Sequence, residues 1–275
     1  MHSVYFVTNP KADDILRRLG QLMKECERVG LAWGMERWAK QALGEAGGQG
    51  SVEVQDCDAL ISLGGDGTLL QAAQLAVAFG KPLLGVNLGR LGFLTETSLD
   101  ELDLSLLREN AFREEKRMLL QVEGKEGTSL ALNDLVVNRG NYSRSIDLDV
   151  WVGQEPLGRY IADGFIVSTP TGSTGYSLSA GGPVVSPALD CMVLTPVCPH
   201  AMQNRPILVP PHEQVRIALH EQRDYHAAVS CDGRSLRELR AGETLAVTGS
   251  EKKLSFIRFR ESEFFRLVRA KLNQT

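Results

Sequence analysis

Asp66 has the setting that most suggests chemistry, because it is a lone carboxylate enclosed by glycines after the apolar run 60–63. Glycine lets the backbone approach a ligand closely, and a helix beginning near Thr68 would leave the N–H groups of residues 67–69 free to face a phosphate. A carboxylate beside a phosphate needs a separate task, such as taking a proton from an attacking hydroxyl. The alternative is an ordinary strand-to-helix turn with Asp66 as the N-cap. The run predicts a phosphate-binding loop made of Gly64, Gly65, Gly67 and Thr68.

A second candidate site is the run DGFIVSTPTGSTGYSLSAGG, which spans Asp163 to Gly182. It begins as an apolar strand and continues with hydroxyls, glycines and the ring of Tyr176. Such a loop offers many hydrogen-bonding groups, close backbone approach and one ring to line a base or sugar pocket. An ordinary surface loop would usually carry more Lys, Glu or Asn and would not follow an apolar strand.

Two familiar nucleotide-binding fingerprints are missing from the sequence. It contains no Walker A lysine loop, and no G-x-G-x-x-G opens a helix after the first expected strand. These absences disfavour a P-loop kinase and a Rossmann dehydrogenase.

The composition is that of an ordinary globular chain of 275 residues, with 43% hydrophobic and 23% charged residues. A formal net charge of −4 argues against nucleic acid as the main partner. We expect a solvated helix face to account for the basic residues near the C-terminus, which are Lys252, Lys253, Arg258, Arg260, Arg266, Arg269 and Lys271.

No apolar run approaches the ~20 residues of a membrane span, and the N-terminus does not look like a signal peptide. Five cysteines are an odd number without paired spacing, which suits reduced thiols. We therefore expect a cytoplasmic protein that does not associate with a membrane. Cys191, Cys198 and His200 suggest a zinc site, but there is no second close pair, so we expect packing and no metal ligation.

The first 115 residues alternate between expected strands and helices. Strands are expected at Val4–Val7, Ala59–Leu63 and Leu83–Val86, and helices from Lys11 to about Val29 and from the glycine loop to Phe79. Residues 30–50 are less regular and end in a glycine-rich loop. Ser98 with Glu101 resembles a capping box for a helix through about Leu107. This alternation predicts an α/β domain whose parallel sheet is covered on both faces.

From about Lys116 the pattern becomes one of short alternating strands. The expected strands are 119–123, 131–138, 146–152, 159–168, 214–219, 227–231, 244–247 and 254–259. We therefore expect a mostly-β domain over residues 116–259. A last helix, Ser262–Leu272, carries apolar residues that need a surface to cover. We expect it to return to the first domain, which then comprises residues 1–115 and 260–275.

Together these motifs resemble the NAD kinase family, whose members phosphorylate NAD to NADP. They occur in the family's order over roughly residues 60–260. The matching segments are Gly64–Thr68, Gly89–Leu94, Asn133-Asp134, Asp163–Gly182, Thr195–His200 with Arg205-Pro206, and Ser230–Gly233.

The resemblance implies a two-domain NAD kinase-like fold with the active site between the domains. It implies that Asp66 is the general base acting on the 2′-hydroxyl of the adenosine ribose, and that the glycine loop lies near the phosphates of ATP. A divalent cation, Mg²⁺, is expected with ATP. The NAD-binding residues implied by the match are Asp66, Gly67, Asn133, Asp134, Arg144, Asp163, Thr174, Gly175, Tyr176, Ser177, Leu178 and Ser179.

Several alternatives accompany this interpretation. Asn133-Asp134 is also the sequence of an Asx-type turn, and Arg144 is also explained as a surface arginine. Gly175 stands where alanine is common in the family, and Arg234 where glutamine is frequent. Part of the family's NAD pocket crosses a subunit boundary, which implies a homodimer or homotetramer. The rival functions are a lipid or sugar kinase with a similar loop, and a catalytically silent NAD(H)- or NADP-binding regulator.

Overall fold

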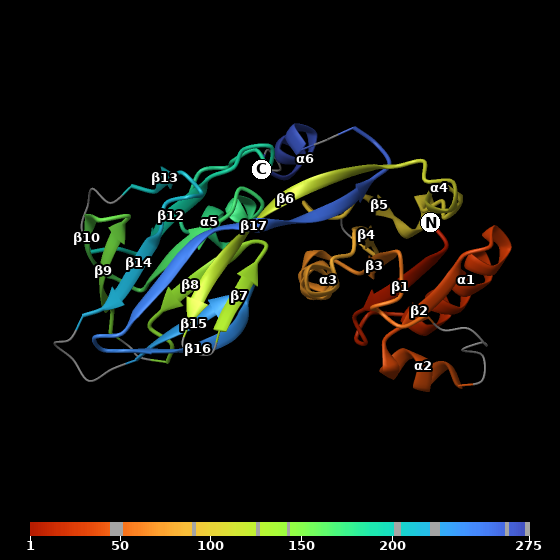
Figure 1. Ribbon diagram of the computed structural model, residues 1–275, viewed down its shortest axis with the longest axis horizontal. Helices are drawn as coiled ribbons and strands as arrows, with labels where there is room; N and C mark the ends of the chain where they lie inside the picture. Colours follow the sequence, from red (N-terminus) through yellow and green to blue (C-terminus); the bar gives the residue numbers. More distant parts are fainter. Residues whose placement is uncertain are drawn as a thin grey trace. The chain divides into compact units, whose positions relative to one another are not determined.

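The computed structural model describes residues 1–44, 52–89, 92–124, 127–141, 144–200, 205–220, 226–261 and 264–272. The chain divides into two compact units (Figure 1). Unit 1 comprises Met1–Lys116 and Leu254–Thr275, and unit 2 comprises Arg117–Lys253. Two long strands, β6 (Arg113–Gly124) and β17 (Thr244–Arg258), carry the chain from one unit to the other.

Unit 1 is built on a parallel sheet in the order β4-β3-β1-β2. The strands are β1 (Ser3–Thr8), β2 (Ala32–Met35), β3 (Ala59–Leu63) and β4 (Leu83–Asn87). Every residue of β1, β3 and β4 is buried, as expected for strands covered on both faces. The C-terminal end of β17 pairs with β4 at Phe256 and Leu83, and the short β5 (Thr97–Ser98) also pairs with β4.

The two faces of this sheet are covered by α1 (Ile15–Val29), α2 (Arg37–Leu43), α3 (Asp66–Phe79) and the short α4 (Ser105–Arg108) (Figure 1). The last helix, α6 (Phe264–Leu272), also belongs to unit 1. On one face, Leu19 of α1 packs in one core cluster with Phe6 and Ile61. On the other face, Leu69 of α3 lies where a side chain on Gly85 would stand, so the helix packs directly on the strand backbone. The expected parallel sheet covered on both faces is confirmed.

Three expectations for unit 1 were wrong. Residues 32–43 are a regular strand and helix rather than an irregular segment. The helix expected from Ser98 is broken into a 3-10 turn at Leu99–Glu101 and α4, and Ser98 makes no side-chain cap. Asp103 Oδ1 instead accepts a hydrogen bond from the Ser105 N–H at 2.9 Å, which favours a turn over a continuous helix. The glycine-rich loop at 45–50 lies outside the described residues.

The third wrong expectation concerns the basic residues near the C-terminus. Arg258 lies on β17, not on a helix, and is only 6% exposed. Its guanidinium pairs with Glu96 and Glu115, each at 3.1 Å. Helix α6 does belong to unit 1, where Lys271 Nζ lies 4.7 Å from the centre of the Phe93 ring. Phe265 is nevertheless 74% exposed.

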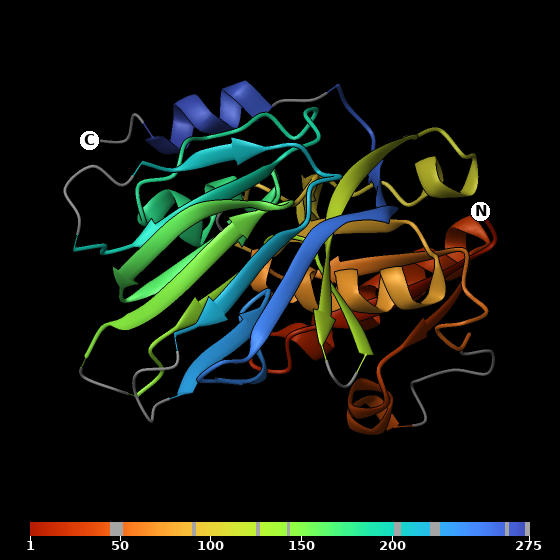
Figure 2. The ribbon, with the colours of Figure 1, turned by 60° about the vertical axis from the view of Figure 1, so that its left-hand side comes forward.

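Unit 2 is built from antiparallel strands that enclose a large apolar core. One sheet has the order β13-β12-β11-β8-β15-β16. In the other sheet, neighbouring strands follow the order β10-β9-β14-β17, and Figure 2 shows these strands from a second side. Buried residues alternate with more exposed ones along β9 and β14, which is the pattern of strands with one face in a core. The expected mostly-β region is confirmed.

The remaining strands of unit 2 are β7 (Gly127–Ala131), β8 (Asp134–Asn138), β9 (Ile146–Val152), β10 (Glu155–Ala162), β11 (Gly164–Ser168), β12 (Met192–Val197), β13 (Ile207–Val209), β14 (Val215–Leu219), β15 (His226–Cys231) and β16 (Arg234–Arg240). A 3-10 turn (Gly172–Thr174) and α5 (Tyr176–Ser179) follow β11. The run expected as one strand at 159–168 is two strands divided at Asp163, and 244–259 is one strand rather than two.

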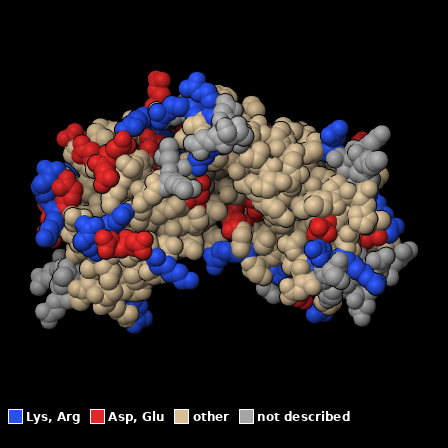
Figure 3. All heavy atoms as spheres, turned by 180° about the vertical axis from the view of Figure 1, so that it is seen from behind, with Lys and Arg blue, Asp and Glu red and all other residues tan. Residues whose placement is uncertain are grey.

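Lys and Arg side chains lie among Asp and Glu side chains on the face shown in Figure 3. None of the helices in the described part of the chain is both long and apolar enough to pass through a bilayer.

Candidate active site

The glycine loop joins the end of β3 to the start of α3. The helix begins at Asp66, with Gly65 as its N-cap, so Asp66 is the first helical residue and not the cap. The Leu69 N–H donates to the Gly65 carbonyl at 3.1 Å, so the expectation that this amide is free for a ligand was wrong. By helix geometry the N–H groups of residues 66–68 precede the first intrahelical bond and face outward along the axis. An α-helix of this length places positive electrostatic potential at that end.

The Asp66 carboxylate is held by the backbone of a second loop, which follows β4. Oδ2 accepts a hydrogen bond from the Phe93 N–H at 3.1 Å, and Oδ1 accepts one from the Leu94 N–H at 3.3 Å. A Cβ on Gly92 would collide with this carboxylate, so the glycine is required for the side chain to occupy its place. Arg90 and Leu91 of the same motif lie outside the described residues.

A buried ion network supports that second loop. The Arg258 guanidinium donates to the Leu94 carbonyl at 3.3 Å, and also pairs with Glu96 and Glu115. Glu96 Oε1 in turn accepts the N–H of Phe259 at 2.8 Å. The orientation of Asp66 is thus fixed through Leu94 by residues almost two hundred positions later in the chain.

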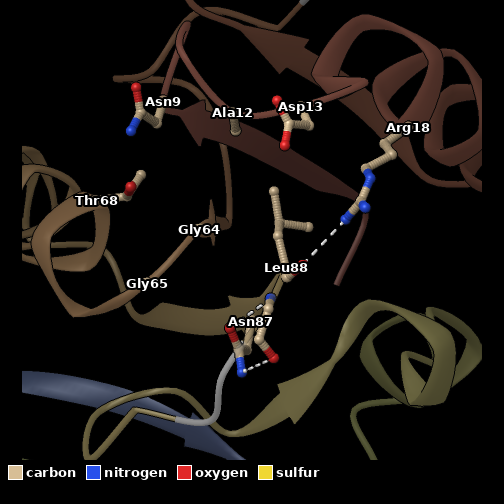
Figure 4. A pocket seen from close by; sticks show the side chains of 10 residues that line it. Asn9, Ala12, Asp13, Arg18, Gly64, Gly65, Thr68, Asn87 and Leu88 are labelled. Atoms are coloured by element: carbon tan, nitrogen blue, oxygen red, sulfur yellow. Dashed lines mark hydrogen bonds between the residues drawn. The ribbon is translucent and has the colours of Figure 1, made fainter.

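A cavity of about 290 Å³ lies at the carboxyl edge of the parallel sheet (Figure 4). Such an edge is where open α/β sheets bind ligands. The cavity is lined by Asn9, Ala12, Asp13, Arg18, Gly64, Gly65, Thr68, Asn87, Leu88 and Gly89. It includes three of the four residues expected to form the phosphate loop.

Arg18 is the only cation among the described residues that line the cavity. Its Nη1 donates to the Leu88 carbonyl at 3.4 Å, and Figure 4 shows the guanidinium directed toward that loop. Sequence reasoning missed Arg18 because it reads as one of two adjacent polar residues on an amphipathic helix. It also missed Asn9 and Asn87, although both follow buried strands and parallel strands end at one edge.

In unit 2, Asn133 lies in the short connection between β7 and β8, and Asp134 is the first residue of β8. Asp134 is 7% exposed, and burial raises the pKa of its carboxyl to about 7, with a further contribution from the negative charge of Asp232. Burial also raises the pKa of Asp232, which hydrogen bonds from three backbone amides oppose. Asn133 Oδ1 is buried and has no hydrogen-bond partner in the described structure.

The loop after β11 packs directly on this connection. The Thr169 N–H donates to the Asn133 carbonyl at 2.9 Å, and the Thr169 hydroxyl donates to the Leu132 carbonyl at 2.6 Å. A side chain on Gly172 would collide with the Asn133 backbone, and Gly175 also lies beside Asn133 and Asp134. The structure therefore brings together two segments that the sequence places more than thirty residues apart.

The remaining residues of this loop differ in their surroundings. Tyr176 is 45% exposed, whereas Ser177 is buried with its hydroxyl 3.0 Å from that of Thr195. Thr174 Oγ1 donates to the Thr171 carbonyl at 3.3 Å. Leu178 is half-buried and Ser179 is exposed.

Asp163 does not join this group within one chain. Asp163 precedes β11 and Thr169 follows it, so the strand separates them by roughly 20 Å. Asp163 Oδ1 pairs with Arg139 Nε at 3.2 Å, and Arg144 is exposed.

The described residues include no group of three or more His, Cys, Asp or Glu side chains arranged to hold a metal ion. Cys198 is exposed, and His200 Nε2 lies 2.9 Å from the Ser145 hydroxyl.

Comparison with known proteins agrees with this architecture. A family model of the ATP-NAD kinase N-terminal domain matches residues 34–109, and one of the C-terminal domain matches residues 132–259. The NAD kinase of Moorella thermoacetica is 46% identical over 228 residues, which are 81% of this chain and 73% of that protein. The NAD kinase of Heliobacterium modesticaldum is 44% identical over 228 residues, 80% of each chain.

Two solved structures share the fold. A yeast NADH kinase complexed with NADH has a TM-score of 0.86 at 24% identity, covering 100% of this chain and 88% of the other. An NAD kinase from Archaeoglobus fulgidus in complex with ATP has a TM-score of 0.75 at 26% identity, covering 100% and 99%. These matches confirm the expected two-domain fold, and the similarity to the curated relatives shows that the chain belongs to the NAD kinase family.

Proposed function

We propose that this chain transfers the γ-phosphate of ATP to the 2′-hydroxyl of the adenosine ribose of NAD, and so makes NADP. The observation that carries the proposal is the setting of Asp66, whose carboxylate is fixed by two backbone amides at the N-terminus of α3. The relatives' activity as NAD kinases supports the same reaction. It disfavours a lipid or sugar kinase and a silent regulator.

Asp66 is the proposed general base. Phosphoryl transfer depends mainly on positioning and on neutralising charge. Two donated hydrogen bonds hold the carboxylate in one orientation, so it can receive the proton of the 2′-hydroxyl as that oxygen attacks phosphorus. The neighbouring amides of Gly67 and Thr68 remain available to the transferred phosphoryl group.

The cavity of unit 1 is the proposed site for the ATP phosphates. Gly64 and Gly65 leave room for close approach, and Arg18 supplies a positive charge from α1. Mg²⁺ is commonly bound by one or two carboxylates together with substrate phosphates, and Asp13 is the acidic residue that lines the cavity. The ion would neutralise phosphate charge when bound with ATP.

Unit 2 supplies the proposed NAD site. The carboxylate of Asp134 is suited to accept two hydrogen bonds from a ribose diol. The Oδ1 atom of Asn133, which has no partner in the described structure, can accept a further hydrogen bond from NAD. The loop from Thr174 to Ser179 adds Gly175 beside them and the exposed ring of Tyr176.

Asp163 lies too far from this site to join it within one chain. We propose that Asp163 and the exposed Arg144 complete the NAD site of a neighbouring copy in a homodimer or homotetramer. A protein that is monomeric in analytical ultracentrifugation and fully active in the same buffer would contradict this shared site.

All five cysteines are free thiols, which supports a cytoplasmic location.

The decisive experiment incubates purified protein with Mg-ATP and NAD and assays NADP with an NADP-specific dehydrogenase. We expect NADP, and a kcat about 10²–10⁴-fold lower in Asp66→Asn. Asp100→Asn, an exposed acid of the same unit, is the matched control. NAD binding without product would favour the regulator, and an Asp66→Asn variant with full turnover would remove the proposed base.

A further inference from the structure

Asp232 and Gly233 form the tight turn of the hairpin between β15 and β16. Both residues have positive φ angles, +49° and +75°. Two successive positive φ values are typical of a type I′ turn, for which Asp-Gly and Asn-Gly are the favoured sequences. As a turn residue, Asp232 needs no particular partner for its side chain.

Its carboxylate nevertheless accepts hydrogen bonds from three consecutive backbone amides of another segment. Oδ2 accepts the Leu132 N–H at 2.8 Å, and Oδ1 accepts the N–H groups of Asn133 at 2.7 Å and Asp134 at 3.2 Å. The Asp232 N–H donates in return to the Asp134 carbonyl at 3.0 Å. A hairpin about one hundred residues later in the chain thus holds the backbone between β7 and β8.

The held segment carries the two polar side chains of the proposed NAD site, and on its other side it contacts Thr169 and Gly172. A shift of the 132–134 backbone would therefore move Asn133 and Asp134 together. Such a shift should weaken the binding of NAD and not that of ATP, because these side chains lie in unit 2 and the cavity proposed for the ATP phosphates lies in unit 1.

We propose that Asp232 is a positioning residue of the NAD site, which holds the backbone of residues 132–134 so that Asn133 and Asp134 face the ribose of NAD. This inference rests on the proposed function. Asp232 would act on NAD through this backbone, because its carboxylate is engaged by the amides of residues 132–134.

The test is Asp232→Asn, which separates the turn from the carboxylate. Asn-Gly suits the same turn, but the side-chain NH₂ cannot accept an N–H, so at least one of the three amides loses its partner. We expect the KM for NAD to rise about tenfold to a hundredfold, since hydrogen bonds to charged groups are the strong ones. The KM for ATP should stay within about twofold. Asp190→Asn removes an exposed carboxylate paired with Lys253 in the same unit, and serves as the control with unchanged KM values.

An unchanged KM for NAD in a folded Asp232→Asn protein would overturn the proposal. An equal rise in the KM values for NAD and for ATP would also overturn it. If Asp232→Asn does not fold, Asp232→Glu keeps the charge but displaces the oxygens, and the same rise in the KM for NAD is expected. Hydrogen exchange at the amides of 132–134 should quicken in either variant. A wild-type protein that makes no NADP would refute the proposed function. An active wild-type protein whose Asp232→Asn variant has an unchanged KM for NAD would refute only this inference.

Discussion

At the scale of single residues, Gly92 shows how the space left by a missing side chain positions a carboxylate. The Asp66 carboxylate fills the space where a Cβ on residue 92 would lie. A glycine in a loop motif is usually credited with backbone freedom, but here the space it leaves is what matters. That role was invisible in the sequence, because residues 66 and 92 are joined only by folding.

Gly92→Ala should therefore act like a mutation of Asp66. The added methyl group displaces the carboxylate from the amides of Phe93 and Leu94, so we expect kcat to fall at least tenfold while the KM values change little. Gly20→Ala on α1, where no atom lies within 4 Å of the new Cβ, is the control. Steady-state kinetics measures both variants, and a Gly92→Ala enzyme with wild-type kcat would show that Asp66 is held in some other way.

Asp134 makes stability depend on pH. Its pKa is about 7 in the folded protein, against about 4 in an unfolded chain. The folded state therefore keeps a proton that the unfolded chain releases between these values, so this contribution to stability is full below pH 4 and is lost as the pH rises through 7.

Asp134→Asn should remove that dependence. We expect the free energy of unfolding of the variant to exceed that of the wild type at pH 8, by up to about 4 kcal/mol, and the difference to shrink toward pH 5. Urea unfolding at several pH values measures it, with Asp190→Asn as the exposed control. Parallel pH curves for the two proteins would contradict the assignment.

At the scale of elements, two adjacent arginines of α1 lie on different sides of the helix and have different surroundings. Arg17 pairs with Asp14 at 3.1 Å on the exposed side, whereas Arg18 lines the cavity of unit 1. Helical periodicity predicted a helix ending at about Val29, as α1 does, although α1 begins at Ile15 and not at Lys11. It could not tell which polar neighbour faces a ligand, because that depends on where the loop after β4 lies.

This difference provides a matched pair of variants. Arg18→Ala should raise the KM for ATP about tenfold to a hundredfold, since it removes a charged donor to phosphate, and leave the KM for NAD unchanged. Arg17→Ala should leave both values unchanged. If Arg18→Ala and Arg17→Ala have the same KM for ATP, Arg18 does not contact ATP.

Other elements show where local patterns failed. The strand Ala32–Met35 has only four residues, too few for a period to be recognised, and it is defined by its pairing with β1. The capping signal at Ser98 was outweighed by Asp103, whose carboxylate accepts hydrogen bonds from the N–H and the hydroxyl of Ser105. By contrast, α3 ends at Phe79 with Gly80 at φ +63°, as the glycine and the following proline predicted.

At the scale of the whole molecule, the pattern of the sequence changes near residue 116. Strand–helix alternation gives way to short alternating strands, and each pattern can bury its apolar residues in only one kind of layer. The membership of β17 was harder to predict. A single 15-residue strand carries Thr244 in unit 2 and Arg258 in unit 1, and it reads as two strands because its exposed middle interrupts the apolar pattern.

The sequence by itself determined the family, the α/β and β-rich organisation, and the loop that surrounds Asp66. These features are carried by contiguous residues whose types and periods act locally. Only the tertiary structure decided what holds the functional groups in place: Asp66 on the amides of 93 and 94, Arg258 behind them, and Asp232 on residues 132–134. Each of these contacts joins segments that are 27 to 164 positions apart. Their formation depends on strand register and packing, which no local pattern of residues encodes.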